Sequence, residues 1–506
     1  MSLQFAFPPN LTTDKFIAQL SVKTALQQVS KQYALKTFYD SFDWRLYNQG
    51  LSGEFTRSKS GSTFTLKQIE QDLALASTEL KEVPAFSQDF QDATLRNLMS
   101  PFLEMRALLP IITLDYDIYH LNVINDDEKT VLRLQVENHE LLDNLVTLFP
   151  LKGYDKAAEQ IAAWFLDMGL SPNPKPLLVN ALTLHGRKPN DYCSKISINL
   201  APDMRADIAA KYIYSHLLQA IKVNEQGTIA DTDSEFLHDF RVAVRRTRAG
   251  LSQLKGVLPD ETTAYFAEFF SWLGQITGPT RDLDVYLLNF SRFKNSLPIA
   301  IRDDLDPLND FLQHKQHHAQ QELAKKLRTP KYLNSLSEWE DYLKAQAPFM
   351  TTQAHGKLNI KQLADHRLWK NYRRVLKEGS AITDSSPAEA LHELRKSCKK
   401  LRYLLEFFQS LYDEAAIKQF IKNLKGLQEV LGNFQDCSVQ EDTLKQFSEQ
   451  MLNEHVHANT LMAMGVLIQN LDTLKHTMRS EFFSKFATFS HEDNHAAFKA
   501  LLVTHG

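Results

Sequence analysis

The stretch LHDFRVAVRRTR, residues 237–248, recurs as LHELRKSCKKLR at residues 391–402, an offset of 154 residues (391 minus 237). A second motif has the same offset, because ITGPTRDLDV (276–285) matches VLGNFQDCSV (430–439). Two separate motifs that share one offset indicate a duplicated structural unit.

The segments around both motifs carry apolar residues at helical spacing and are interrupted by Gly and Pro. They predict an all-α domain at about 200–490, formed by two pseudosymmetric helical bundles. Repeat one is expected at about 203–328 and repeat two at about 357–488.

Each copy of the basic motif gathers cations on one side of a helix. At about 100° per residue, Arg241, Arg245 and Arg248 fall in one arc of roughly 80° beside His238, and Arg246 points elsewhere. The second copy repeats the pattern with His392, Arg395, Lys399 and Arg402 on one stripe and Lys400 off it.

Like charges at this spacing destabilise an isolated helix by tenths of a kcal/mol per pair. A fold that tolerates them twice usually offsets the repulsion with a bound anion. The alternative is a solvated face neutralised by neighbouring acids, for which the candidates are Asp231, Asp233, Glu235, Asp239, Glu389 and Glu393. Because the two copies match in register and each begins with His, we favour the anion.

Asp282 and Asp436 also correspond across the repeats, and Asp284 follows in the first copy. They could act as metal ligands or bases, but we favour pairing with the Arg stripes or with a helix N-terminus. Gly278 and Gly432 match too and predict a helix end or a close helix crossing.

The composition excludes several classes of protein. Hydrophobic residues make up 43% of the 506 residues and charged residues 23%, as in ordinary globular proteins. No apolar run is long enough for a membrane helix, and no secretory signal is recognisable at the N-terminus. The three cysteines are too few for a disulfide framework and form no CxxC element for zinc. We expect a cytoplasmic protein without a membrane partner.

Net charge alone does not identify a partner. Residues 1–200 hold 19 Lys and Arg against 23 Asp and Glu, and residues 201–506 hold 38 of each. The question is therefore where the positive charge is concentrated.

Residues 1–195 have a different pattern of apolar and polar residues, which predicts an α+β domain with a mostly antiparallel sheet. Strands are expected within 35–49, 61–70, 112–124 and 129–138, where aromatic, β-branched and alternating apolar residues occur. Helices are expected near 65–80 and 138–148 and at 153–170, and connecting structure at about 171–192.

The duplicated pattern H-x-x-R-x-x-x-[RK]-[RK]-x-R resembles the CHAD domain, a conserved-histidine α-helical domain. The resemblance covers roughly residues 200–490 and implies a basic cleft between two four-helix bundles that binds inorganic polyphosphate. The site it implies comprises His238, Arg241, Arg245, Arg246, Arg248, His392, Arg395, Lys399, Lys400 and Arg402. The second copy has Gln435 where Arg281 stands in the first.

The segment FYDSFDWRLYNQGLSGEFTRSKSGSTFTLKQ (38–68) resembles the CYTH, or triphosphate tunnel, domain. Tunnel enzymes open with an ExExK strand, but here Ser2, Gln4 and Ala6 stand in those places. Glu54 and Thr56 replace basic residues. Without paired carboxylates there is no evident Mg²⁺ or Mn²⁺ site, so we expect a degenerate, inactive CYTH-like domain.

Together these features predict a polyphosphate-binding protein that needs no catalysis and no cofactor. Closely spaced Arg guanidinium groups would each donate two hydrogen bonds to the oxygens of one phosphate. A histidine could add a further hydrogen bond, which is stronger when the ring is charged below about pH 6.5. Association with polyphosphate granules would follow from such binding. Protein partners, oligomeric state and preferred chain length stay open.

Three alternatives remain. One is a triphosphatase acting from the N-terminal domain, which the absence of an ExExK motif disfavours. Another is a nucleic-acid-binding protein, disfavoured by the zero net charge of residues 201–506 and by stripes without interleaved aromatics. The third is metal binding through His314 and His318 of HKQHH (314–318), for which a solvated helix face is the simpler explanation.

Overall fold

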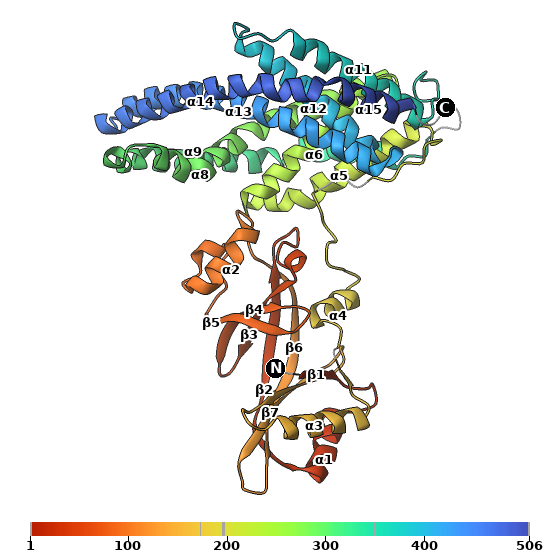
Figure 1. Cartoon of the computed structure of the whole chain (residues 1–506), viewed down its shortest axis with the longest axis vertical. Coiled ribbons are helices and arrows are strands. Elements are labelled where there is room, and N and C mark those ends of the chain that lie inside the picture. Colours follow the sequence, from red (N-terminus) through yellow and green to blue (C-terminus); the bar gives the residue numbers. More distant parts are fainter. Residues whose placement is uncertain (1–2, 173, 195–197, 348–350, 504–506) are drawn as a thin grey trace. The chain divides into compact units, whose positions relative to one another are not determined.

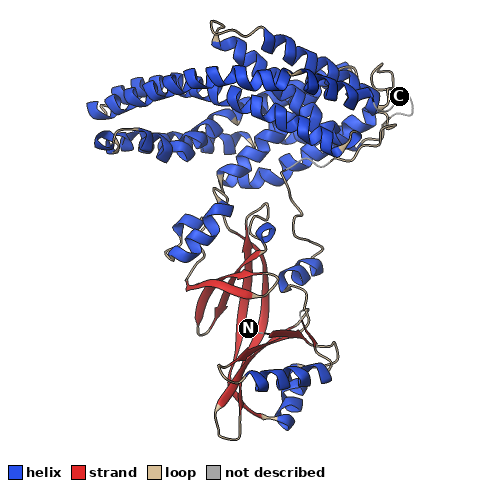
Figure 2. Cartoon of the chain, viewed as in Figure 1, coloured by secondary structure: helices blue, strands red, loops and turns tan. Residues whose placement is uncertain are grey.

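The computed structural model describes residues 3–172, 174–194, 198–347 and 351–503 of the chain. It divides into two compact units, Met1–Ser194 and Lys195–Gly506. The first unit contains all the strands and the second unit is helical, as Figure 2 shows. This is the α+β and all-α division that the sequence predicts.

The N-terminal unit is built on one antiparallel, curved sheet of nine strands in the order β5-β4-β3-β2-β6-β7-β8-β1-β9. Its centre is the pair β2 (Ala25–Asp40) and β6 (Leu109–Ile124), which stay in register along 16 residues each apart from two irregularities. The other strands are β1 (Leu3–Ala6), β3 (Leu51–Ser58), β4 (Gly61–Gln68), β5 (Leu73–Glu79), β7 (Thr130–His139), β8 (Leu145–Pro150) and β9 (Ser171–Pro172).

The described part of this unit also contains the α-helices α1 (Thr13–Lys23), α2 (Ala93–Leu103), α3 (Asp155–Asp167) and α4 (Leu177–Leu184). The helix predicted at 153–170 is confirmed, and its Phe165 packs with Phe5 and Phe16 in one of the cores. The helices predicted near 65–80 and 138–148 are wrong, because those segments contain strands β4, β5 and β8. Apolar residues in both segments recur about one helical turn apart, as Leu66, Ile69 and Leu73 do, but pairing within the sheet overrides this local pattern.

The helical unit begins with α5 (Ala206–Ala230), α6 (Ser234–Gln253), α7 (Asp260–Ile276), α8 (Gly278–Ser296), α9 (Asp306–Lys326) and α10 (Pro330–Lys344). It continues with α11 (Ile360–Ser380), α12 (Ala388–Phe408), α13 (Glu414–Asn453), α14 (Ala458–Ser490) and α15 (Glu492–Val503). No described helix is long and apolar enough to cross a membrane.

The repeat is visible in the helix bounds. Adding 154 to the first residues of α5, α6 and α7 gives the first residues of α11, α12 and α13. Reciprocal backbone hydrogen bonds join the repeats at equivalent places, since Ala206 N donates to Leu358 O over 2.9 Å and Ile360 N donates to Met204 O over 2.8 Å. Such an exchange between equivalent positions is what a twofold relation produces.

The repeats differ at one helix break. The long helix α13 corresponds to α7 and α8 together, which are separate helices that meet at Thr277. Pro279 follows this break, whereas Asn433 occupies the equivalent place within α13. Proline has no N–H for the helical hydrogen bond and its ring crowds the carbonyl four residues earlier. The helix end predicted at Gly278 is therefore confirmed, whereas Gly432 lies inside a continuous helix.

Both helical cores combine the two repeats. One core joins α5, α6, α7 and α10 with α11, α12, the first half of α13 and α15. The other joins α8 and α9 with the second half of α13 and the first half of α14. The two repeats therefore share their apolar interior, which holds α6 and α12 in contact (Figure 1).

Candidate functional site: a cationic cavity between the two repeats

The two basic motifs lie on α6 and α12, where these helices meet. A cavity of about 380 Å³ opens there, with α13 as its third wall. Its charged and polar lining comprises His238, Arg245, Arg246, Arg395, Lys399, Arg402, Tyr403, Glu406, Lys425, Gln428 and Glu429. Six of the ten residues predicted from the sequence thus surround one space, and six cations face two carboxylates.

The centre of the cavity brings together cations from both repeats. Arg245 Nη2 donates a hydrogen bond to Tyr403 Oη over 2.9 Å, which fixes its guanidinium against the neighbouring repeat. Arg395 Nη2 lies 3.4 Å from Asp436 Oδ1. The predicted pairing of Asp436 with the Arg stripe is therefore confirmed. In the equivalent pair, Arg241 counteracts the rise that burial produces in the pKa of Asp282.

The ammonium group of Lys399 lies in an unfavourable place for a charge. Burial and the nearby guanidinium groups of Arg245 and Arg395 lower its pKa to about 7, against the opposing effect of Asp436. Desolvation and like charge both disfavour the protonated form. The empty cavity therefore holds more positive charge than its own acids compensate, and an entering anion would relieve this.

Arg241 and Arg248 do not line the cavity, although the helical wheel places them on the stripe. Arg241 Nη1 donates to Gly274 O at 3.2 Å and Thr277 Oγ1 at 2.9 Å, so it caps the end of α7. Arg248 lies so close to Gly274 that a Cβ atom there would be 2.8 Å from its Nη1. Their part in binding stays a prediction.

Arg246 corrects the helical-wheel argument. It was expected to point away from the stripe, but it lines the cavity and forms an ion pair with Glu406 over 2.8 Å. The wheel considers one helix alone, whereas α12 approaches α6 on the side that carries Arg246. Of the remaining predicted residues, Lys400 is half-buried outside the cavity lining and His392 Nδ1 lies 2.7 Å from Gln435 Oε1.

Sequence analysis did not single out Tyr403, Glu406, Lys425, Gln428 or Glu429. Tyr403 and Glu406 continue the cavity-facing side of α12 beyond Arg402, so extending the wheel by one turn would have found them. The three residues of α13 carry no such signal, because only the packing of α13 beside α12 brings them there.

The N-terminal unit has a polar cavity of its own, of about 660 Å³, on the inner side of its sheet. Lys36 Nζ lies 3.0 Å from Glu137 and 3.9 Å from Glu54, and Lys67 Nζ lies 3.2 Å from Glu54 and 2.9 Å from Asp72. Burial alone would lower the pKa of Lys36, but the two carboxylates raise it overall. These lysines are already neutralised.

The altered opening strand faces this cavity. Gln4 of β1 lines it and donates hydrogen bonds to Asp72 and Thr147, at 3.5 and 3.3 Å. Ser2 lies outside the described residues. A carboxamide therefore stands where a tunnel enzyme would place a metal-binding carboxylate.

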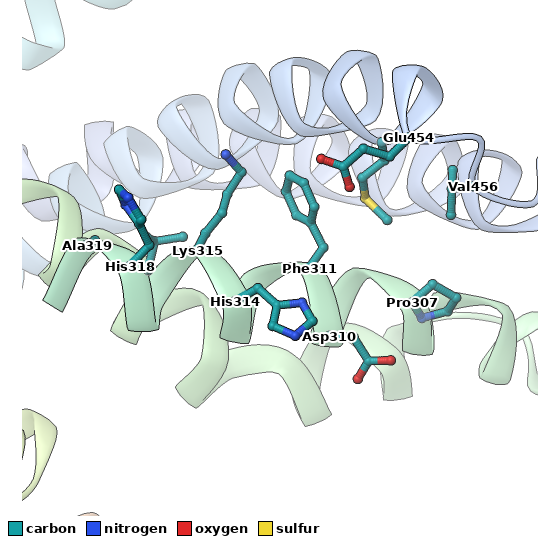
Figure 3. Close-up of a pocket in the computed structure, with 11 residues that line it drawn as sticks. Pro307, Asp310, Phe311, His314, Lys315, His318, Ala319, Glu454 and Val456 are labelled. Atoms are coloured by element: carbon teal, nitrogen blue, oxygen red, sulfur yellow. The ribbon is translucent and has the colours of Figure 1, made fainter. Parts of the chain in front are cut away.

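A third cavity, of about 720 Å³, lies between α9 and the end of α13. Figure 3 shows Phe311 and Lys315 projecting from α9 toward the segment that carries Glu454. His314 and His318 line this cavity with Asp310, but no set of three or more His, Cys, Asp or Glu in the described segments is arranged to hold a metal.

Comparison with known proteins places the cationic cavity within a matched segment. Residues 213–445 match the family model described as the CHAD domain. Similar solved structures include a CHAD domain from the plant Ricinus communis, with 23% identity over 60% of this chain and 96% of that one, at a TM-score of 0.46. Another is PptA from Streptomyces chartreusis, with 15% identity over 56% and 99% of the two chains and a TM-score of 0.45.

The N-terminal sheet has its own counterparts. A putative adenylyl cyclase from Hippeastrum, described as having a dominant triphosphatase activity, is 9% identical over 38% of this chain and 99% of that one, at a TM-score of 0.27. No curated protein matches the chain. With its curved antiparallel sheet around a polar cavity, the N-terminal unit resembles the CYTH fold.

Proposed function

Because residues 213–445 form a CHAD domain, we propose that this protein binds inorganic polyphosphate in the cavity between its two helical repeats. The observation that carries the proposal is the convergence of Arg245, Arg395 and Lys399 from two separate repeats on one space. A flexible polyanion can place successive phosphates against such a cluster, and each guanidinium can donate to two oxygens of one phosphate.

Binding without catalysis is the simplest use of this cavity. Within the cavity lining, neither α6 nor α12 presents a nucleophile with an adjacent base. The two carboxylates of the lining lie among cations. The N-terminal unit supports the same proposal, because Glu54, Glu137 and Asp72 already neutralise the lysines that would otherwise meet a triphosphate. We therefore propose a binding protein, with polyphosphate as partner and polyphosphate granules as a place where it would collect.

The test is a titration of the purified full chain with long-chain polyphosphate, tripolyphosphate and duplex DNA at two salt concentrations. We expect polyphosphate to bind most tightly, with an affinity that falls steeply with salt because counterions are released. Equal or tighter binding of DNA would refute the proposal, and so would the absence of polyphosphate binding at low salt.

Two variants locate the site. Arg245→Ala should weaken polyphosphate binding about 10- to 100-fold, since a charge-assisted hydrogen bond contributes about 1.5–3 kcal/mol. Lys377→Ala removes an equal charge from an exposed position of α11 in the same unit and should leave the affinity nearly unchanged. Similar losses in both variants would show that binding is not confined to the cavity.

A further inference from the structure

Glu406 is a carboxylate in the middle of the cationic cavity. Its Oε2 accepts hydrogen bonds from Arg246 Nε at 3.1 Å and Nη2 at 2.8 Å, and its Oε1 accepts one from Arg402 Nε at 2.8 Å. The side chains of Glu406 and Arg246 are each only 13% exposed. Both oxygens of this carboxylate are therefore committed to guanidinium groups that line the cavity.

This arrangement divides the cations of the cavity into two groups. Arg246 and Arg402 are neutralised by Glu406. Among the described residues, Arg245 and Lys399 form no ion pair, and the pKa of Lys399 is lowered as a result of burial and of its cationic neighbours. An entering anion thus meets an uncompensated part of the cavity and a part where a carboxylate already stands.

The repeat shows that the fold does not require this carboxylate. The residue equivalent to Glu406 in the first repeat is Ser252, 154 positions earlier, and the residue equivalent to Arg402 is Arg248. Arg248 is held against Gly274 and forms no ion pair within the described ranges. An arginine at this place of the repeat is therefore compatible with folding in the absence of an acidic partner.

We propose that Glu406 is an internal competitor for the ligand, occupying the place of one phosphate group between Arg246 and Arg402 until a polyphosphate chain displaces it. The inference rests on the proposed function. A carboxylate and a phosphate both offer two oxygens to a guanidinium fork, so the exchange replaces one anionic group by another without leaving either arginine unpaired.

Two consequences follow for binding. Glu406 holds the arginines in place before the ligand arrives, which lowers the ordering cost of binding. It also lowers the affinity, because displacing it breaks its hydrogen bonds. The ligand class that displaces it is a polyanion with several adjacent charges, which can first bind at Arg245 and Lys399 and then replace the carboxylate from there.

Glu406→Gln in the full chain tests this inference, because it removes the charge and keeps one oxygen acceptor. We expect polyphosphate to bind on the order of 10-fold more tightly, with a steeper dependence on salt because Arg246 and Arg402 would then release solution anions. Glu449→Gln is the matched control. It removes an equal charge from an exposed position of α13 outside the cavity lining, and we expect a change of less than about 3-fold.

The outcomes separate the inference from the proposed function. A parent protein that does not bind polyphosphate overturns both. A parent that binds, with Glu406→Gln at unchanged or weaker affinity, overturns the inference alone, and so does an equal gain in Glu449→Gln. If Glu406→Gln does not fold, Glu406→Ser replaces it, because serine stands at the equivalent position of the first repeat. Glu406→Ser must then bind polyphosphate on the order of 10-fold more tightly than the parent for the inference to stand.

Discussion

Binding of polyphosphate should be coupled to protonation of Lys399. Its pKa of about 7 in the empty cavity results from burial and from Arg245 and Arg395. A phosphate group beside it would favour the charged form and raise the pKa toward or above its ordinary value. The protein must therefore take up a proton when it binds polyphosphate above pH 7.

The size of the effect follows from the pKa. Above pH 7 the protonated fraction of Lys399 in the free protein falls about tenfold for each pH unit. If the bound state requires the proton, the apparent affinity falls in the same proportion, by about 10-fold between pH 7.5 and 8.5.

The assay is calorimetry at pH 7.5 and 8.5 in pairs of buffers with different ionisation enthalpies. Long chains are used so that the titrating end groups are few. The parent should show an enthalpy that depends on the buffer, corresponding to uptake of up to one proton per site. Lys399→Arg keeps the charge and does not titrate, so it should bind with a nearly constant affinity. A parent with constant affinity and a buffer-independent enthalpy would refute the assignment of the proton to Lys399.

Three further predictions concern other parts of the chain. Arg241→Ala should destabilise the helical unit by about 1–3 kcal/mol in denaturant unfolding, because it removes one donor to Gly274 O and the donor to Thr277 Oγ1; unchanged stability would contradict its role as the cap of α7. Lys36→Ala should destabilise the N-terminal unit by about 3–5 kcal/mol, because buried Glu137 loses its partner, and Lys36→Met combined with Glu137→Gln should recover most of the loss. The pKa of Glu137 is lowered chiefly by Lys36, against the effect of burial, so this stabilisation is present above the ordinary carboxyl pKa and is lost on acidification. Finally, the chain should release no phosphate from triphosphate with Mg²⁺ or Mn²⁺; metal-dependent release that Lys67→Ala abolishes would contradict the assignment of the N-terminal unit as inactive.

The charges of the two units illustrate two different uses of buried cations. In the N-terminal unit Lys36 and Lys67 each lie within 4 Å of two carboxylates, which offset the cost of removing their charge from water. In the helical unit Arg245 and Lys399 have no such carboxylate among the residues described. An uncompensated cationic cavity destabilises the empty protein and is relieved by an anion, whereas a compensated one has little to gain from a ligand.

The sequence by itself determined the duplication, its 154-residue offset and the all-α character of the second half. These features are local, since apolar spacing and motif identity are set by the chain within a few helical turns. It also identified His238, Arg245, Arg395, Lys399 and Arg402 as residues that lie together, and the structure places them in the lining of one cavity.

Only the tertiary structure decided which cations line the cavity. Arg241 and Arg248 lie on the predicted stripe, yet the neighbouring α7 engages one as a cap and holds the other against Gly274. Arg246 lies about 100° from Arg245 on the wheel, yet its ion pair with Glu406 of α12 brings it into the cavity. The spacing along one helix fixes the angle of a side chain about that helix. Its partner depends on contacts between residues far apart in the sequence, such as Arg246 and Glu406, which are 160 positions apart.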